Sequence, residues 1–207
     1  MNSGVGGDLE TVQMHIEDVA GATSKIASFS AQGIQTLKID GGTAGLDFQI
    51  VGPLDAGLKT INASGAASNL TLDVSKSTQA MHITMGSGND LLKTGDTLLP
   101  IAGLVDTLIG GPGTDTMEAI FTTSGTRQPI MSGFEIANLT FNANAVFNFT
   151  DVNDLHTINV ASSTNRIALH DMDATVTTIS VTGPQAPGDG EGPGGGRHVY
   201  WYGEGKA

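Results

Sequence analysis

The stretch LKTINASGAASNLTLDV, residues 58–74, decides the fold. Apolar and polar side chains alternate along residues 60–63, directly after Leu58 and Lys59, and again along residues 70–74. The small residues Ser64, Gly65 and Ala66 separate these two alternating runs. Alternation with a period of two predicts β-strands, and small residues between them predict a tight corner. The stretch therefore predicts two short strands that meet at a corner.

The first strand of this unit recurs along the chain as the sextet apolar-x-Thr-apolar-x-apolar. The copies are Leu9–Met14, Ile34–Ile39, Leu58–Ala63, Leu155–Val160 and Val176–Val181, with a looser copy at Ile136–Phe141. Successive starts lie 25 and 24 residues apart in the first half of the chain, and 19 and 21 apart in the second. One unit of this size does not bury its apolar face alone, whereas stacked units do. An antiparallel β-sandwich also alternates, but it does not repeat one sextet at a regular period.

The composition agrees with stacked short strands. Of 207 residues, 39% are hydrophobic but only 5% are aromatic, and 29 are glycine. We therefore expect an all-β, right-handed parallel β-solenoid whose core consists of aliphatic side chains. The net charge of −12, with 21 acidic and 9 basic residues, disfavours nucleic acid as a partner and favours divalent cations. The chain has no cysteine, and no apolar stretch is long enough for a membrane span.

A different, glycine-rich pattern occupies the middle of the chain. Residues 110–118, GGPGTDTME, fit the nonapeptide G-G-x-G-x-D-x-U-x, where U is a large apolar residue. Residues 86–92, GSGNDLL, repeat most of it, and shorter echoes occur at 95–98 and 106–109. Glycines allow tight turns whose carbonyl oxygens point inward, and the aspartate adds a carboxylate. Such hard oxygens are the ligands of Ca²⁺, so the pattern predicts Ca²⁺ binding; the alternative is a glycine-rich loop with unliganded aspartates.

Together, the sextets and the block GSGNDLL…DTLIGGPGTDTM resemble the Ca²⁺-dependent RTX-type surface-layer proteins of Gram-negative bacteria, of the Caulobacter type, and related large RTX proteins. The resemblance covers about residues 8–183. It implies type I secretion without a cleaved signal peptide, folding outside the cell on meeting Ca²⁺, and assembly into a lattice at the cell surface. The ligands that the resemblance implies are the carboxylates of Asp90, Asp106 and Asp115, with Asp96 as a weaker candidate, and the turn carbonyls of Gly86, Gly88, Gly111 and Gly113.

Four regions follow from these patterns. Residues 1–80 and 119–183 are expected to form plain solenoid turns, and residues 81–118 the Ca²⁺-binding turns of the same domain. Proline or glycine fills nine of the thirteen positions 184–196. We therefore expect residues 184–207 to be a flexible linker and an aromatic tail.

Three functions are compatible with this organisation. The first is a structural, non-catalytic surface-layer protein whose partners are other copies of itself and a cell-surface polysaccharide. The second is a Ca²⁺-stabilised adhesin or ligand-binding module of a larger RTX protein. The third is a solenoid enzyme acting on polysaccharide, for which His156, His170 and Asp171 would be the candidate residues. The scarcity of aromatic side chains, which commonly stack on sugars, argues against the second and the third.

Overall fold

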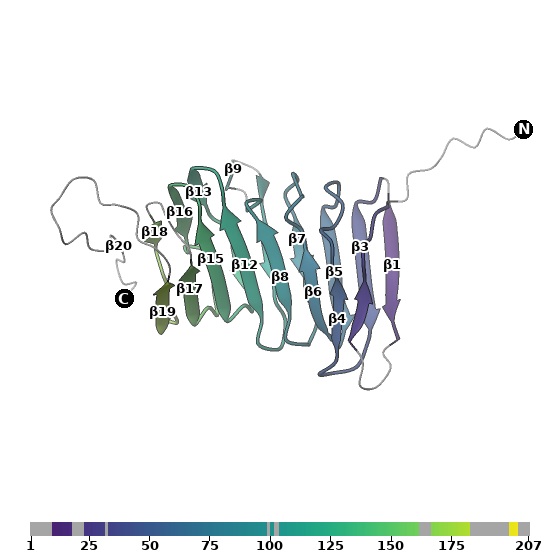
Figure 1. Cartoon of the computed structure of the whole chain (residues 1–207). Helices are drawn as coiled ribbons and strands as arrows, with labels where there is room; N and C mark the ends of the chain where they lie inside the picture. The colour runs from purple at the N-terminus through teal and green to yellow at the C-terminus, as the bar shows by residue number, and fades with distance from the viewer. Residues whose placement is uncertain are drawn as a thin grey trace, which may run out of the picture.

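The computed structural model is a stack of short β-strands wound into a parallel β-solenoid of about seven turns (Figure 1). It describes residues 10–17, 23–31, 33–98, 100–101, 104–161, 167–182 and 199–202. Nearly all strands pair in parallel with the strand one turn before and one turn after. The prediction of an all-β parallel solenoid is therefore confirmed. No helix that could span a membrane occurs among these residues.

Three parallel sheets form the faces of the solenoid. Within a sheet, neighbouring strands come from successive turns, but not every turn has a strand in all three sheets. The first sheet consists, in spatial order, of β1 (Thr11–Ile16), β3 (Thr36–Gly41), β5 (Thr60–Ala66), β7 (His82–Thr84), β11 (Thr107–Ile109) and β14 (Ile130–Ser132). The second consists of β2 (Ser24–Ile26), β4 (Asp47–Ile50), β6 (Asn69–Asp73), β8 (Leu91–Gly95), β12 (Thr116–Phe121), β15 (Ile136–Phe141), β17 (Thr157–Ala161) and β19 (Thr178–Thr182). The third consists of β13 (Gly125–Arg127), β16 (Ala145–Asn148), β18 (Ile167–His170) and β20 (Val199–Tyr202). A small antiparallel pair, β9 (Pro100–Ile101) and β10 (Leu104–Val105), lies outside these sheets.

The alternation seen in the sequence becomes columns of stacked side chains inside the solenoid. In the second sheet, Leu92 pairs with Met117, Met117 with Ala137, and Ala137 with Ile158. All four side chains are buried, while their neighbours along each strand face outward. Burial of such aliphatic columns provides the main stabilising free energy, at about 25 cal/mol per Å² of apolar surface. The core of the later turns also holds phenylalanines, including Phe121 and Phe141, whose ring centroids lie 4.8 Å apart.

The repeated sextet changes face along the chain. In the first half, the copies form strands β1, β3 and β5 of the first sheet. In the second half, they form β15, β17 and β19 of the second sheet. The sextet moves from the first sheet to the second between its copies on either side of the glycine-rich residues 81–118. The third sheet begins after these residues, at β13. The glycine-rich block thus lies where the solenoid gains a third face.

The tail prediction for residues 184–207 concerns residues that mostly lie outside the described part of the chain. Within it, Val199–Tyr202 form β20, which pairs in parallel with β18 on the third sheet.

Candidate metal centre at the glycine-rich corner

The corner between the first and second sheets aligns one residue from each turn at the start of the second-sheet strand or directly before it. The register of β6, β8, β12 and β15 places Leu70, Asp90, Asp115 and Glu135 at equivalent positions in four successive turns. Three of these residues are acidic. We call Asp90, Asp115 and Glu135 the acid column.

Each member of the acid column accepts a hydrogen bond from the backbone of the preceding turn. Asp90 Oδ1 accepts from the Leu70 N–H at 2.7 Å, and Asp115 Oδ1 accepts from the Asp90 N–H at 2.7 Å. Glu135 Oε2 accepts from the Asp115 N–H, also at 2.7 Å. The second oxygen of Asp90 accepts from the Gly86 N–H at 2.9 Å. The carboxylates therefore accept hydrogen bonds from backbone N–H groups that do not pair with a neighbouring strand at this corner. These hydrogen bonds connect successive turns.

Burial and mutual repulsion make ionisation at this corner costly. Burial raises the pKa of Asp90, although the hydrogen bonds from Leu70 and Gly86 oppose the shift. Burial, together with the negative charges of Asp90 and Glu135, raises the pKa of Asp115 to about 7, although the hydrogen bond from the Asp90 N–H opposes the shift. Asp115 has no exposed surface in the folded chain. Its carboxylate thus titrates near neutral pH instead of near 3.8.

The glycines of the motif allow the corner segments to stack backbone on backbone. A Cβ at Gly113, whose φ is +148°, would lie 2.0 Å from the carbonyl oxygen of Gly88. A Cβ at Gly111 would lie 2.2 Å from the carbonyl oxygen of Gly86. Gly86 and Gly88 approach the turn before them in the same way. The close stacking therefore explains all four predicted glycines, and the carbonyls of Gly86 and Gly88 face the following turn.

One oxygen at this corner has no hydrogen-bond partner. Oδ2 of Asp115 is buried and unpaired, while Oδ1 of the same carboxylate is satisfied by Asp90. A Cβ at Gly110 would lie 2.8 Å from this Oδ2 and 1.8 Å from the carbonyl oxygen of Gly133. The missing side chain of Gly110 therefore leaves a carboxylate oxygen of Asp115 and the carbonyl oxygen of Gly133 on one side of the corner, while the carboxylate of Glu135 accepts from the Asp115 N–H. A hard cation prefers oxygens of this kind, so Asp115, Glu135 and Gly133 fit Ca²⁺ as ligands.

Asp106 lies at a different corner from Asp90 and Asp115. It precedes β11, at the opposite end of that strand from Asp115, and its Oδ1 accepts from the Met81 N–H at 2.7 Å. The nine-residue spacing between Asp106 and Asp115 therefore separates two corners of one turn. Residues that stack on one another across turns lie 20 or 25 positions apart at these corners. The predicted ligands Asp106 and Asp115 are thus not brought together.

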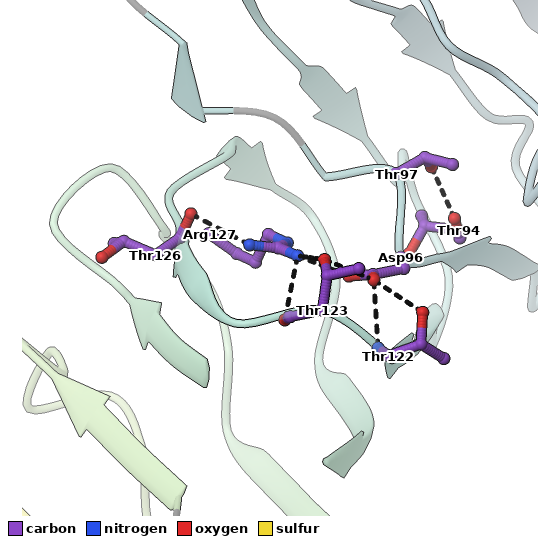
Figure 2. A network of polar contacts seen from close by, with 7 residues as sticks. All are labelled: Thr94, Asp96, Thr97, Thr122, Thr123, Thr126 and Arg127. Atoms are coloured by element: carbon purple, nitrogen blue, oxygen red, sulfur yellow. Dashed lines mark hydrogen bonds and ion pairs between the residues drawn. The ribbon is translucent and has the colours of Figure 1, made fainter. Parts of the chain in front are cut away.

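Asp96 lies at a third place, directly after β8 of the second sheet, and forms an ion pair with the buried Arg127 (Figure 2). Its Oδ1 accepts from Nη2 of Arg127 at 2.6 Å, and its Oδ2 accepts from the N–H and hydroxyl of Thr122 and from the Thr123 hydroxyl. Arg127 comes from β13 and also lies over the ring of Phe121, 5.8 Å from its centroid. Burial alone would raise the pKa of Asp96, but the hydrogen bonds from Arg127, Thr122 and Thr123 lower it overall. This carboxylate serves an ion pair that connects two turns.

Sequence reasoning missed Glu135 and Arg127. A signal for Glu135 was present, because Gly133-Phe134-Glu135 continues the Gly-x-acid pattern of Gly88-Asn89-Asp90 and Gly113-Thr114-Asp115. This signal was weak, because the acidic residue is a glutamate instead of an aspartate and the first glycines of the nonapeptide are absent. The partner of Arg127 lies 31 residues away in the sequence, and no local pattern marks that pair.

The residues considered for catalysis do not form a cluster. His156 directly precedes β17 of the second sheet, whereas His170 ends β18 of the third sheet. Asp171 is exposed, and its Oδ2 accepts from the hydroxyl of Thr150 at 3.3 Å.

Among the described residues, no three His, Cys, Asp or Glu side chains gather closely enough to hold a metal ion by themselves. A Ca²⁺ ion at the acid column would therefore need carbonyl oxygens or water in addition to carboxylates. Comparison of the chain with protein-family models, curated proteins and solved structures finds no match.

Proposed function

We propose that this chain is a structural, Ca²⁺-stabilised β-solenoid that acts outside the cell as a subunit of a self-assembling surface layer. The observation that carries the proposal is the buried, unpaired Oδ2 of Asp115, which shares the space beside Gly110 with the carbonyl oxygen of Gly133. A buried carboxylate oxygen without a partner is costly unless something binds it. On this proposal Asp115, Glu135 and the Gly133 carbonyl hold one Ca²⁺ ion.

The electrostatics of the acid column support a role in folding control. Without a cation, ionisation of Asp115 next to Asp90 and Glu135 destabilises the folded corner. A bound Ca²⁺ ion would neutralise this repulsion and link two turns, so that its binding free energy adds to folding. Extracellular modules bind Ca²⁺ with dissociation constants of about 10⁻⁴–10⁻³ M. A site of that affinity is empty inside a cell and filled outside, which fits type I secretion of an unfolded chain.

A structural role is favoured over sugar binding or polysaccharide chemistry by where the phenylalanines lie. Six of the seven, Phe48, Phe121, Phe134, Phe141, Phe147 and Phe149, are buried in the core. The seventh, Phe29, is half-buried and packs against the same core. The seven phenylalanines therefore offer no exposed aromatic face on which a sugar ring could stack.

The proposal is tested by a Ca²⁺ titration of protein stripped with EDTA, followed by circular dichroism and light scattering. We expect a gain of β signal at submillimolar to millimolar Ca²⁺, followed by growth of large particles. Asp115→Asn should abolish the response to Ca²⁺. Asp106→Asn is the matched control, because it replaces another buried aspartate that accepts a backbone hydrogen bond at a different corner. An unchanged response in Asp115→Asn, or its loss only in Asp106→Asn, would place the site elsewhere.

A further inference from the structure

The last strand of the second sheet exposes a residue that belongs to the interior. Ile179 of β19 pairs with Ile158 of β17 and continues the buried column that begins at Leu92. Ile158 is fully buried, whereas 37% of the surface of Ile179 is exposed. β19 lies at one end of the stack and β1 at the other (Figure 1). The core of the solenoid is therefore open to solvent at the β19 end.

β19 also lacks the features that protect an edge strand from pairing with other chains. Within the described residues it is the terminal strand of the second sheet and has β17 as its only neighbouring strand. Residues 174–182, ATVTTISVT, contain no charge, no proline and no glycine, and seven of the nine are β-branched. Natural edge strands are commonly protected by lysine, proline or a bulge. β19 is instead well suited to accept a further strand.

The chain itself does not supply an obvious strand for this edge. β20, the next strand, pairs with β18 on the third sheet. The intervening residues 184–196 consist mostly of proline and glycine. Proline removes a ladder donor and glycine weakens a strand, so this composition is unsuited to extending the second sheet. A strand from a second copy of the chain can take this position.

The opposite end of the same molecule carries a matching strand. β1 is the terminal strand of the first sheet, and among the described strands it pairs only with β3. Its residues Thr11-Val12-Gln13-Met14 repeat the pattern of Thr178-Ile179-Ser180-Val181 in β19. Val12 and Met14 are only half-buried against the core, so this end also exposes interior positions. Both end strands carry the sextet that already stacks on itself in parallel within the chain.

We propose that β19 of one copy pairs in parallel with β1 of the next, so that chains stack head to tail. The inference rests on the proposed self-assembly and specifies the surface that performs it. Thr178 would lie opposite Thr11, Ile179 opposite Val12, and Ser180 opposite Gln13. Because the two surfaces differ, the contact is heterologous and does not close on itself unless the rotation forms a ring. The assembly would therefore grow as a filament that extends the solenoid axis.

The absence of cysteine from the chain allows a direct test by cross-linking. Neighbouring strands lie about 4.8 Å apart, which is within the Cα–Cα range of a disulfide. Gln13→Cys and Ser180→Cys place thiols at facing outward positions, and the two single variants are mixed in Ca²⁺ under mild oxidation. We expect a covalent dimer at least about tenfold more abundant than in a mixture of Gln13→Cys with Asn138→Cys. Asn138 is the matched control because it lies in the same outward column as Ser180, two turns inside the stack.

A second variant separates failure of this contact from failure of self-assembly. Ile179→Lys places a charge at the exposed end of the core and should prevent particle growth, while the circular dichroism response to Ca²⁺ stays unchanged. Particles that form in Ca²⁺ without the cross-link, and that Ile179→Lys does not prevent, would overturn the head-to-tail contact but leave self-assembly standing. A wild-type protein that stays monomeric at all Ca²⁺ concentrations would overturn both.

Discussion

Asp115→Asn should remove a pH-dependent destabilisation of the Ca²⁺-free protein. The folded chain raises the pKa of Asp115 from 3.8 to about 7 by burial and by the charges of Asp90 and Glu135. Between these two values the folded state binds more protons than the unfolded state, so the free energy of unfolding falls as pH rises. Below pH 3.8 the effect is absent, and above pH 7 it is complete.

The size of this effect follows from the shift. The shift from 3.8 to about 7 is about three pKa units, which corresponds to about 4 kcal/mol at 1.36 kcal/mol per unit. About two of these units fall between pH 5 and pH 8, so about 2–3 kcal/mol of the effect is expected in that range. Asparagine keeps an oxygen that accepts the hydrogen bond from Asp90 and carries no charge. The NH₂ group of the asparagine would take the place of the unpaired Oδ2 and would lack a hydrogen-bond partner there. This lowers the free energy of unfolding by about 1 kcal/mol at every pH. The pH-dependent part of the difference therefore isolates ionisation of Asp115.

Urea unfolding in EDTA, followed by circular dichroism at pH 5, 6, 7 and 8, measures this difference when a fixed concentration of sucrose keeps both Ca²⁺-free proteins folded before urea is added. We expect the variant to gain about 2–3 kcal/mol relative to wild type between pH 5 and pH 8, with the slope against urea unchanged. A difference between the two proteins that is constant across this pH range would refute the reasoning, because Asp115 would then not titrate near neutral pH.

Three further predictions concern the same corner and its surroundings. If Ca²⁺ competes with a proton on Asp115, the apparent dissociation constant measured by calorimetry should be about tenfold larger at pH 6 than at pH 8. Equal dissociation constants at the two pH values would contradict direct ligation of Ca²⁺ by Asp115. Gly113→Ala should destabilise the fold by more than about 3 kcal/mol in urea titrations, because its Cβ would overlap a backbone oxygen. The control is Gly45→Ala, at φ +79° in open space, which should cost only about 1 kcal/mol. Equal losses of stability in the two variants would contradict close stacking at Gly113. Arg127→Met should cost about 2–3 kcal/mol by leaving the partly buried Asp96 without its cation, and adding Asp96→Asn should recover part of the loss. A double variant no more stable than the single one would show that the pair is not the cause. Since the pKa of Asp96 is lowered, the stability that this pair contributes should be present above its unfolded-state pKa near 3.8 and be lost as pH falls through the folded-state value, which acid titration of wild type and the double variant would compare.

The solenoid could be predicted because its determinants are local and periodic. Alternation along residues 60–63 and 70–74 specifies which side chains face inward, and the regular return of the sextet specifies stacking in parallel. What periodicity does not specify is the face on which a sextet lies. The copies at β3 and β17 look alike in sequence, yet they lie on different sheets. That assignment depends on corner geometry accumulated over several turns.

The candidate site could be predicted only in part, for a related reason. The pattern Gly-x-Asp marks corner residues, so Asp90 and Asp115 were identifiable as neighbours once stacking was assumed. Whether Asp106 joins them depends on turn length, because two aspartates nine residues apart lie at opposite ends of one strand when a turn has 20–25 residues. The engagement of Asp96 by Arg127 depends on a contact across 31 residues. The unpaired oxygen of Asp115 is a property of packing that composition does not reveal.

The central claim is that the Asp115 corner binds Ca²⁺, and isothermal titration calorimetry of EDTA-stripped protein at pH 8 tests it most directly. We predict about one Ca²⁺ ion per chain at this corner, with a dissociation constant of about 10⁻⁴–10⁻³ M for wild type. We predict that Asp115→Asn loses this binding while Asp106→Asn retains it. Binding of equal strength and stoichiometry in wild type and Asp115→Asn, or no binding to wild type at 10 mM Ca²⁺ (roughly tenfold above that range), would contradict the claim.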